Sequence, residues 1–157
     1  MPRIPRDQPL LPTILDRLVD DGSSWEGRIN VRGLKESVRR DLERLLNTRR
    51  RCIPWPDEYE DLELSMYSYG IPDFTGTNAS SADDVHFFLR SIQETIRRFE
   101  PRFKSVRVTL IEDGEEEDRV LRFRIDGLLH AEPVPEPAVF DTEMEPGTGT
   151  FAVQSIG

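Results

Sequence analysis

The chain has 157 residues and a mass of 18.1 kDa, which is the size of one domain. Its net charge of −9, from 21 Lys or Arg and 30 Asp or Glu, argues against non-specific binding to nucleic acid or to an anionic membrane. A single cysteine, Cys52, cannot form a disulfide within the chain, and two histidines leave little for a metal site. We therefore expect a soluble cytoplasmic protein without a cofactor.

The N-terminal residues are rich in proline, so we expect residues 1–12 to form a flexible arm and residues 13–157 a single domain. A short amphipathic segment begins within or just after this arm. Its apolar side chains are Leu11, Ile14, Leu15 and Leu18. A helix of about two turns is marginal in water on its own. This apolar knob must therefore dock, either on the core of its own domain or in a groove of a partner.

The first long helix is predicted near residues 33–50. Its apolar residues recur with a period of 3.6 and lie on one stripe: Leu34, Val38, Leu42, Leu45 and Leu46. Three arginines, Arg49 to Arg51, are expected at its C-terminal end, where cations complement the helix dipole. A shorter helix is predicted within residues 57–74, with Gly70 as its left-handed cap.

The clearest periodicity in the chain predicts a helix from about Val85 to Phe99. Ser80 or Ser81 is suited to cap its N-terminus. The helix must end near Phe99, because Pro101 pushes the residue before it out of helical geometry.

After Pro101 the apolar period changes from 3.6 to 2. Residues 106–110 and 121–125 alternate apolar and polar side chains around an acidic turn, which indicates an antiparallel hairpin. A third strand is predicted through residues 138–142 and a short last one around Phe151 and Val153. Helices first and strands last predict an α+β fold in which N-terminal amphipathic helices precede a small antiparallel sheet of three to four strands.

Charge is unevenly distributed along the chain. Residues 28–51 carry nine Lys or Arg and three acidic residues, whereas residues 112–157 carry three basic and twelve acidic residues. The pattern is compatible with two solvated faces, or with a position in an assembly where charge complementarity sets docking and register.

Several segments together resemble one protein family. Leu10–Leu18, Leu42–Arg50, Tyr69–Phe74, Ile96–Phe103 and Phe140–Thr142 are similar, in this order, to motifs of TssE, the baseplate subunit of type VI secretion systems. The family also covers phage tail baseplate wedge proteins and IraD-like proteins. The resemblance spans about residues 10–153 and includes the triplet Glu100-Pro101-Arg102.

The resemblance implies a structural role in the baseplate of a contractile injection machine. It implies binding to the baseplate subunits TssF, TssG and TssK and a platform for polymerisation of the TssB/TssC sheath. It implies no cofactor, nucleic acid or membrane insertion. A type VI system, a phage tail and an extracellular injection particle remain alternatives. The isolated chain is expected to be monomeric, because no long heptad repeat is left over.

Three groups of residues are candidate partner-binding sites. The first is Glu100, Pro101 and Arg102, where the proline fixes a rigid corner from which both charges are expected to project, to engage a partner or each other. The second is the apolar knob of Leu11, Ile14, Leu15 and Leu18. The third is an expected terminal strand at Val139, Phe140 and Asp141, open to strand addition from a neighbour.

Two other functions remain as alternatives. A lysozyme-type glycosidase needs two carboxylates flanking a sugar cleft, one of them with a raised pKa. Glu100 is the one acid with a defined setting, and the neighbouring Arg102 acts to lower the pKa of that carboxyl. We therefore expect no enzymatic activity. The other alternative, implied by the resemblance, is a soluble adaptor or anti-adaptor of the same fold.

Overall fold

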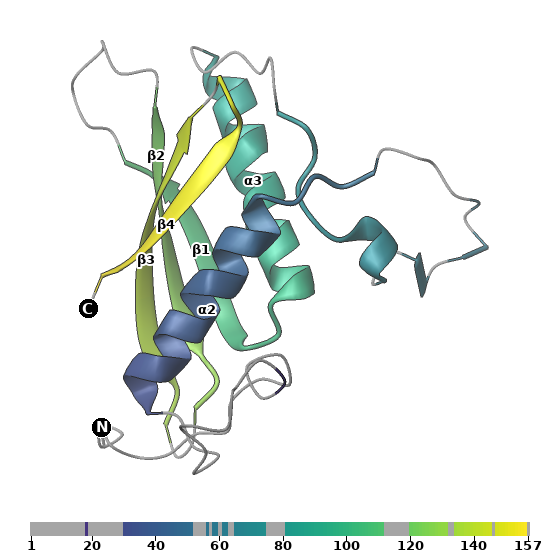
Figure 1. The fold of residues 1–157 in the computed structure, drawn as a ribbon. Coiled ribbons are helices and arrows are strands. Elements are labelled where there is room, and N and C mark those ends of the chain that lie inside the picture. Colours follow the sequence, from purple (N-terminus) through teal and green to yellow (C-terminus); the bar gives the residue numbers. More distant parts are fainter. Residues whose placement is uncertain are drawn as a thin grey trace.

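The computed structural model describes residues 18, 30–51, 56, 58–59, 61–62, 65–74, 81–111, 120–131, 134–145 and 147–156. Two long helices pack on one four-stranded antiparallel sheet (Figure 1), which confirms the α+β prediction. The helices are α2 (Val31–Leu46) and α3 (Ala82–Phe99). The strands are β1 (Phe103–Leu110), β2 (Leu121–Leu129), β3 (Glu136–Glu145) and β4 (Thr150–Ile156).

The helix α2 begins and ends at specific side-chain contacts. The side chain of Asn30 accepts a hydrogen bond from the Gly33 amide at the N-terminus, and Asn47 is the C-terminal cap. The helix therefore ends at Leu46, earlier than the expected residue 50. Arg49 lies beyond the end but donates to the Leu46 carbonyl at 3.1 Å, which matches the expected pairing of a cation with the helix C-terminus.

The helix α3 has the expected bounds within a few residues. Ser81 caps it by accepting from the Asp84 amide, and Asp83 and Asp84 occupy the first turn, where acidic groups favour the helix dipole. It ends at Phe99, as the position of Pro101 predicts.

The helix predicted within residues 57–74 is wrong for the described part of this segment, which holds a short 3-10 helix, η2 (Met66–Ser68), and no α-helix. Backbone bonds between the segment and the chain after α2 explain this. Ile71 donates to the Thr48 carbonyl at 2.9 Å and accepts from the Arg50 amide at 2.8 Å, so the chain is held extended there. Gly70 has a φ of 104°, which confirms the predicted left-handed residue.

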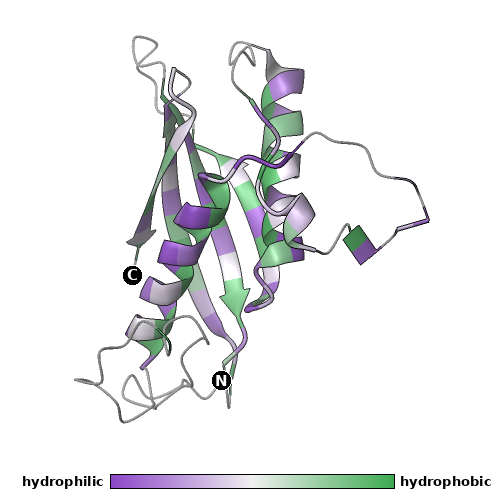
Figure 2. Ribbon diagram, turned by 45° about the vertical axis from the view of Figure 1, so that its right-hand side comes forward, coloured by the Kyte–Doolittle hydropathy of each residue, from purple (hydrophilic) through white to green (hydrophobic). Residues whose placement is uncertain are grey.

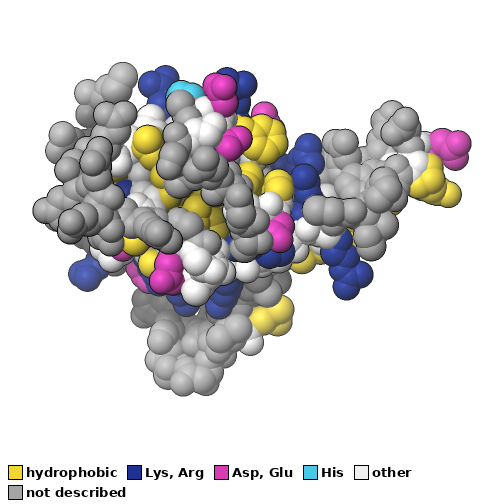
Figure 3. All heavy atoms as spheres, turned by 90° about the horizontal axis from the view of Figure 1, so that it is seen from above, with side chains coloured by type: hydrophobic (Ala, Val, Ile, Leu, Met, Phe, Trp, Pro, Cys, Tyr) yellow, Lys and Arg dark blue, Asp and Glu magenta, His cyan; other side chains and the backbone are white. Residues whose placement is uncertain are grey.

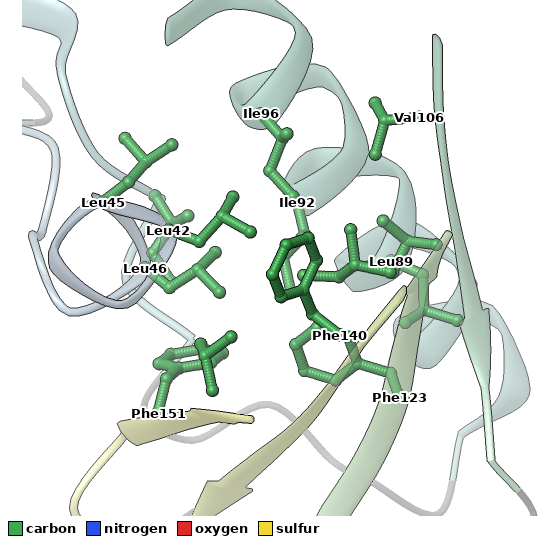
Figure 4. Packing of buried hydrophobic residues seen from close by; sticks show 14 of the residues in the cluster. Leu42, Leu45, Leu46, Leu89, Ile92, Ile96, Val106, Phe123, Phe140 and Phe151 are labelled. Carbon is green, nitrogen blue, oxygen red and sulfur yellow. The ribbon is translucent and has the colours of Figure 1, made fainter. Parts of the chain in front are cut away.

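The sheet has the order β1-β2-β3-β4, so every neighbouring pair is an antiparallel hairpin. Alternate residues of each strand point to the helices and form one core with them. Figure 2 shows green hydrophobic residues on the sides of α2 and α3 that face the sheet, and Figure 4 shows their packing against Phe123, Phe140 and Phe151. The other face of the sheet is not covered by either helix.

Candidate assembly interface

The Glu100-Pro101-Arg102 triplet forms the corner between α3 and β1. Glu100 caps α3 by donating its amide to the Ile96 carbonyl, and its side chain turns back inside the corner. Arg102 donates its Nε to Glu100 Oε1 at 2.7 Å, and its Nη2 contacts Glu100 Oε2. The Arg102 amide also donates to Oε1, at 3.2 Å. Both carboxylate oxygens of Glu100 are therefore engaged by the residue two positions later.

The same guanidinium reaches across to α2. Arg102 Nη1 donates to Ser37 Oγ at 2.9 Å, and Nη2 donates to Asp41 Oδ2 at 2.6 Å. Ser37 and Asp41 are one helical turn apart, so both lie on the face of α2 that meets the corner. Burial lowers the pKa of Arg102, but hydrogen bonds and charges from Glu100 and Asp41 outweigh it, so the pKa lies above its ordinary value. The partly buried guanidinium stays charged and joins α2 to α3 and β1.

The expectation that Glu100 and Arg102 project from the corner is wrong. Glu100 is 5% exposed, and both charges are satisfied within the chain. The reason is the position of Asp41 and Ser37, which α2 brings to within reach of the long arginine side chain. The corner is a structural joint, and any partner that binds there meets Pro101 and the remaining 18% of the Arg102 side chain rather than two free charges.

Residues 138–144 do not form a terminal strand, so that expectation is also wrong. They belong to β3, whose backbone pairs with β2 on one side and β4 on the other. Phe140 is fully buried in the core. Val139 and Asp141 lie on the uncovered face of the sheet, where Asp141 accepts from Arg124 at 2.7 Å. The edge of the sheet was predicted at the wrong strand because β4 is longer than the short run around Phe151 and Val153 that the sequence pattern indicates.

The true edge strands are β1 and β4, and helix side chains hydrogen bond to both. On β1, Gln93 of α3 accepts from the Val108 amide at 3.0 Å, and Arg97 donates to the Val106 carbonyl at 3.4 Å. On β4, Asn47 bonds both the amide and the carbonyl of Phe151, each at 2.9 Å. These contacts protect the edges of the sheet from uncontrolled pairing.

The apolar knob is largely outside the described residues: Leu11, Ile14 and Leu15 all lie there, as does the proposed arm of residues 1–12. Leu18 is described, and it is helical and 75% exposed.

Part of the basic charge of residues 28–51 is paired with acidic side chains. Arg39 pairs with Glu36 and Glu43 on α2, and Lys35 pairs with Glu136 on β3. In the view of Figure 3, basic and acidic side chains both occur on the described surface, with hydrophobic side chains between them. The acidic turn at residues 112–118 lies outside the described residues.

Sequence reasoning missed four polar residues of α2 and its cap that organise these contacts. They are Ser37, Asp41, Glu43 and Asn47. The sequence signal that could have found them is a polar residue at a position that the apolar stripe places on the buried side of α2. Ser37 is such a residue, and it is 2% exposed. Their partners are 61 to 110 residues away, and the sequence does not name them.

Comparison with known protein families identifies the family to which the chain belongs. The model of the baseplate wedge protein gp25 family matches residues 32–134, which run from the start of α2 past β2 and include the corner. The chain belongs to the baseplate wedge protein gp25 family. No curated protein and no solved structure matches the chain.

Membership of the gp25 family places the chain among structural baseplate components of phage-tail-like systems. In the part of the chain that the structure describes, no helix is long and apolar enough to cross a membrane. Among the same residues there is no group of three or more His, Cys, Asp or Glu side chains that could hold a metal ion.

Proposed function

We propose that this gp25-family chain is the TssE subunit of a type VI secretion baseplate in the bacterial cytoplasm. It binds the baseplate subunits TssF, TssG and TssK and helps to nucleate the TssB/TssC sheath. The observation that carries the proposal is the family match over residues 32–134, which contains the corner, together with the TssE-like segments at Tyr69–Phe74 and Phe140–Thr142.

Partner binding is proposed at three places on the chain. The corner of Glu100, Pro101 and Arg102 offers a rigid surface whose shape depends on the joint to α2. Val139 and Asp141 offer side chains on the uncovered face of the sheet. The apolar knob of Leu11, Ile14, Leu15 and Leu18 inserts into a hydrophobic groove of a wedge partner.

The proposal includes no catalytic step. Glu100 is 5% exposed and has both carboxylate oxygens bonded to Arg102, so this carboxyl is not presented to a substrate. A cavity of about 80 Å³ lies between Arg50, Pro72 and the outer side of α3, well below the roughly 300 Å³ of the smallest typical ligand pockets. Glu94 is the carboxylate that lines this cavity, whereas hydrolysis of a glycoside needs a pair of carboxyl groups.

Purification of the chain from its own bacterium tests the proposal. A tagged full-length chain should co-purify TssF, TssG and TssK, and its deletion should abolish extended TssB/TssC sheaths in cells. Recovery of phage tail or injection-particle proteins would move the chain to that system. Recovery of a response-regulator adaptor instead of baseplate proteins would contradict the proposal.

A further inference from the structure

A hollow on the outer side of α3 is lined by side chains from two separate parts of the chain. It is the cavity of about 80 Å³ beside Arg50 and Pro72. The α3 residues that line it are three or four positions apart, so they share one side of the helix. They are Ser91, Glu94, Thr95, Arg98 and Phe99. The core residues Leu89, Ile92 and Ile96 lie on a neighbouring side of α3, so the hollow is separate from the core.

The wall of the hollow opposite α3 is held in place by backbone hydrogen bonds. Ile71 donates to the Thr48 carbonyl at 2.9 Å and accepts from the Arg50 amide at 2.8 Å. These bonds fix Arg50 beside Pro72, in a segment that runs next to α3 (Figure 1). The hollow is therefore formed in the free chain, and an occupant does not have to order it.

The hollow brings two guanidinium groups together with one carboxylate. Arg50 and Arg98 supply two positive charges and Glu94 one negative charge, so the lining residues carry a net charge of +1. The neighbours in sequence, Arg51 and Asp73, cancel each other. This local excess contrasts with the net charge of −9 of the whole chain. It favours an anionic occupant.

The size of the hollow and the chemistry of arginine suit a single carboxylate group. A volume of about 80 Å³ is that of roughly two or three water molecules. A guanidinium has five N–H donors, so an arginine that pairs with a carboxylate of its own chain still binds a second one. Arg102 shows this in the same structure, because it bonds both Glu100 and Asp41.

An exposed aromatic ring continues the same side of α3 towards the N-terminus of the helix. Phe87 lies four residues before Ser91 and is 63% exposed. Its ring packs edge-on against Phe74, with 6.4 Å between the ring centroids, and Phe74 packs in the same way on the buried Phe88, at 4.8 Å. Phe87 is thus held in a fixed place while most of its side chain faces solvent. An exposed aromatic beside an arginine is typical of residues that dominate binding at interfaces.

We propose that this side of α3 binds an acidic segment of a wedge subunit. One Asp or Glu side chain of the segment enters the hollow between Arg50 and Arg98, and an apolar side chain covers Phe87. This rests on the proposed function, because a baseplate partner supplies the segment. Phe87 and Glu94 are seven residues apart, or about 10 Å along the helix axis. The apolar and acidic side chains of the partner are therefore about three residues apart in an extended chain.

Charge reversal at Arg98 tests the proposal in the full-length chain, with a purified complex of TssF, TssG and TssK as the probe. Arg98→Glu should weaken binding about thirtyfold, and Arg98→Lys, which keeps the charge, should lose much less. Arg90→Glu is the matched control and should bind like the unmodified chain. Arg90 is an exposed arginine of the same helix that does not line the hollow.

Melting curves of these variants separate binding from a purely structural role of Arg98. Arg98 lies in the last turn of α3, where a cation favours the helix dipole. A structural role alone would lower the melting temperature of Arg98→Glu and leave its binding unchanged, which would overturn the proposal. Equal weakening of binding by Arg90→Glu and Arg98→Glu would also overturn it, because the effect would then be one of overall charge.

Phe87 tests the apolar half of the site. Phe87→Ser should weaken binding about tenfold, whereas Phe87→Leu, which stays apolar, should bind nearly as well as the unmodified chain. Replacement of Phe87 by the photo-cross-linker p-benzoylphenylalanine locates the partner segment. The cross-linked peptide should belong to TssF, TssG or TssK and carry an Asp or Glu about three residues from the cross-link.

A cross-link to a second copy of this chain, or to a peptide without an acidic residue, would overturn the proposal. Unchanged binding of both Arg98→Glu and Phe87→Ser would do the same. The proposed function fails separately, if the unmodified chain binds none of the three wedge subunits.

Discussion

Arg102 Nη2 lies 2.6 Å from Asp41 Oδ2, across 61 residues of sequence, and this contact closes the corner between α3 and β1 onto α2. Glu100 and Ser37 complete the group. The triplet therefore acts first as a joint of the fold. Any effect of its substitution on baseplate assembly has to be separated from an effect on folding.

Arg102→Ala should lower the free energy of unfolding by about 3 kcal/mol, because it leaves the buried carboxylate of Glu100 without its partner. Urea denaturation of the purified variant measures this. Arg44→Ala is the matched control, since the Arg44 side chain is 65% exposed and pairs with Asp41 at 3.4 Å, and it should cost less than about 0.5 kcal/mol. A stable Arg102→Ala variant that fails to assemble would show that the corner acts mainly in docking.

Asn47→Ala should lower stability by about 1–2 kcal/mol and increase amide exchange at Phe151, because two hydrogen bonds at the β4 edge are lost. Asn47→Asp retains an acceptor for the Phe151 amide but has no donor for its carbonyl. Exchange at this amide should therefore remain slow in Asn47→Asp and become fast in Asn47→Ala. Equal protection in both variants would mean that another group covers Phe151.

Gly127→Ala should destabilise the chain by about 1–3 kcal/mol, the usual cost of overpacking. A Cβ at Gly127 would lie 2.2 Å from Cε1 of Phe103, whose ring packs edge-on against Phe140. Gly147→Ala is the control, because a Cβ there meets nothing within 4 Å. Thermal unfolding of the two variants should differ clearly, and similar melting temperatures would show that the Phe103 ring moves aside at little cost.

Tyr69 should make the chain sensitive to alkaline pH. Its pKa is raised by burial and by the negative charges of Asp41 and Glu100. The folded state therefore holds the phenolic proton more tightly than the unfolded state, so this contribution to stability is complete below about pH 10 and is lost as pH rises through the folded pKa. Tyr69→Phe should flatten the decline of stability above pH 10. An unchanged decline would assign it to other groups.

Local patterns in the sequence determined the helices, the strands and the α+β order. The stripe of Leu34 to Leu46 and the alternation around Val106 and Phe123 each require one buried face, and Pro101 and Gly70 fix conformations through their own backbone chemistry. These are properties of neighbouring residues, so one sequence is enough to predict them. The helix prediction failed for the short segment around η2, because hydrogen bonds from Ile71 to the distant residues 48–50 override the weak helical pattern of the segment.

Only the tertiary structure decided what the polar residues do. Whether Glu100 and Arg102 project or close depends on Asp41 and Ser37, and whether Val139 to Asp141 form an edge depends on how far β4 extends. The same holds for Asn47, which the sequence shows as the end of a helix and the fold places against Phe151. A hydrogen bond requires its donor and acceptor atoms to be placed within a few tenths of an ångström. The packing of α2 on the sheet sets these atomic positions, and the spacing of residues along the chain does not.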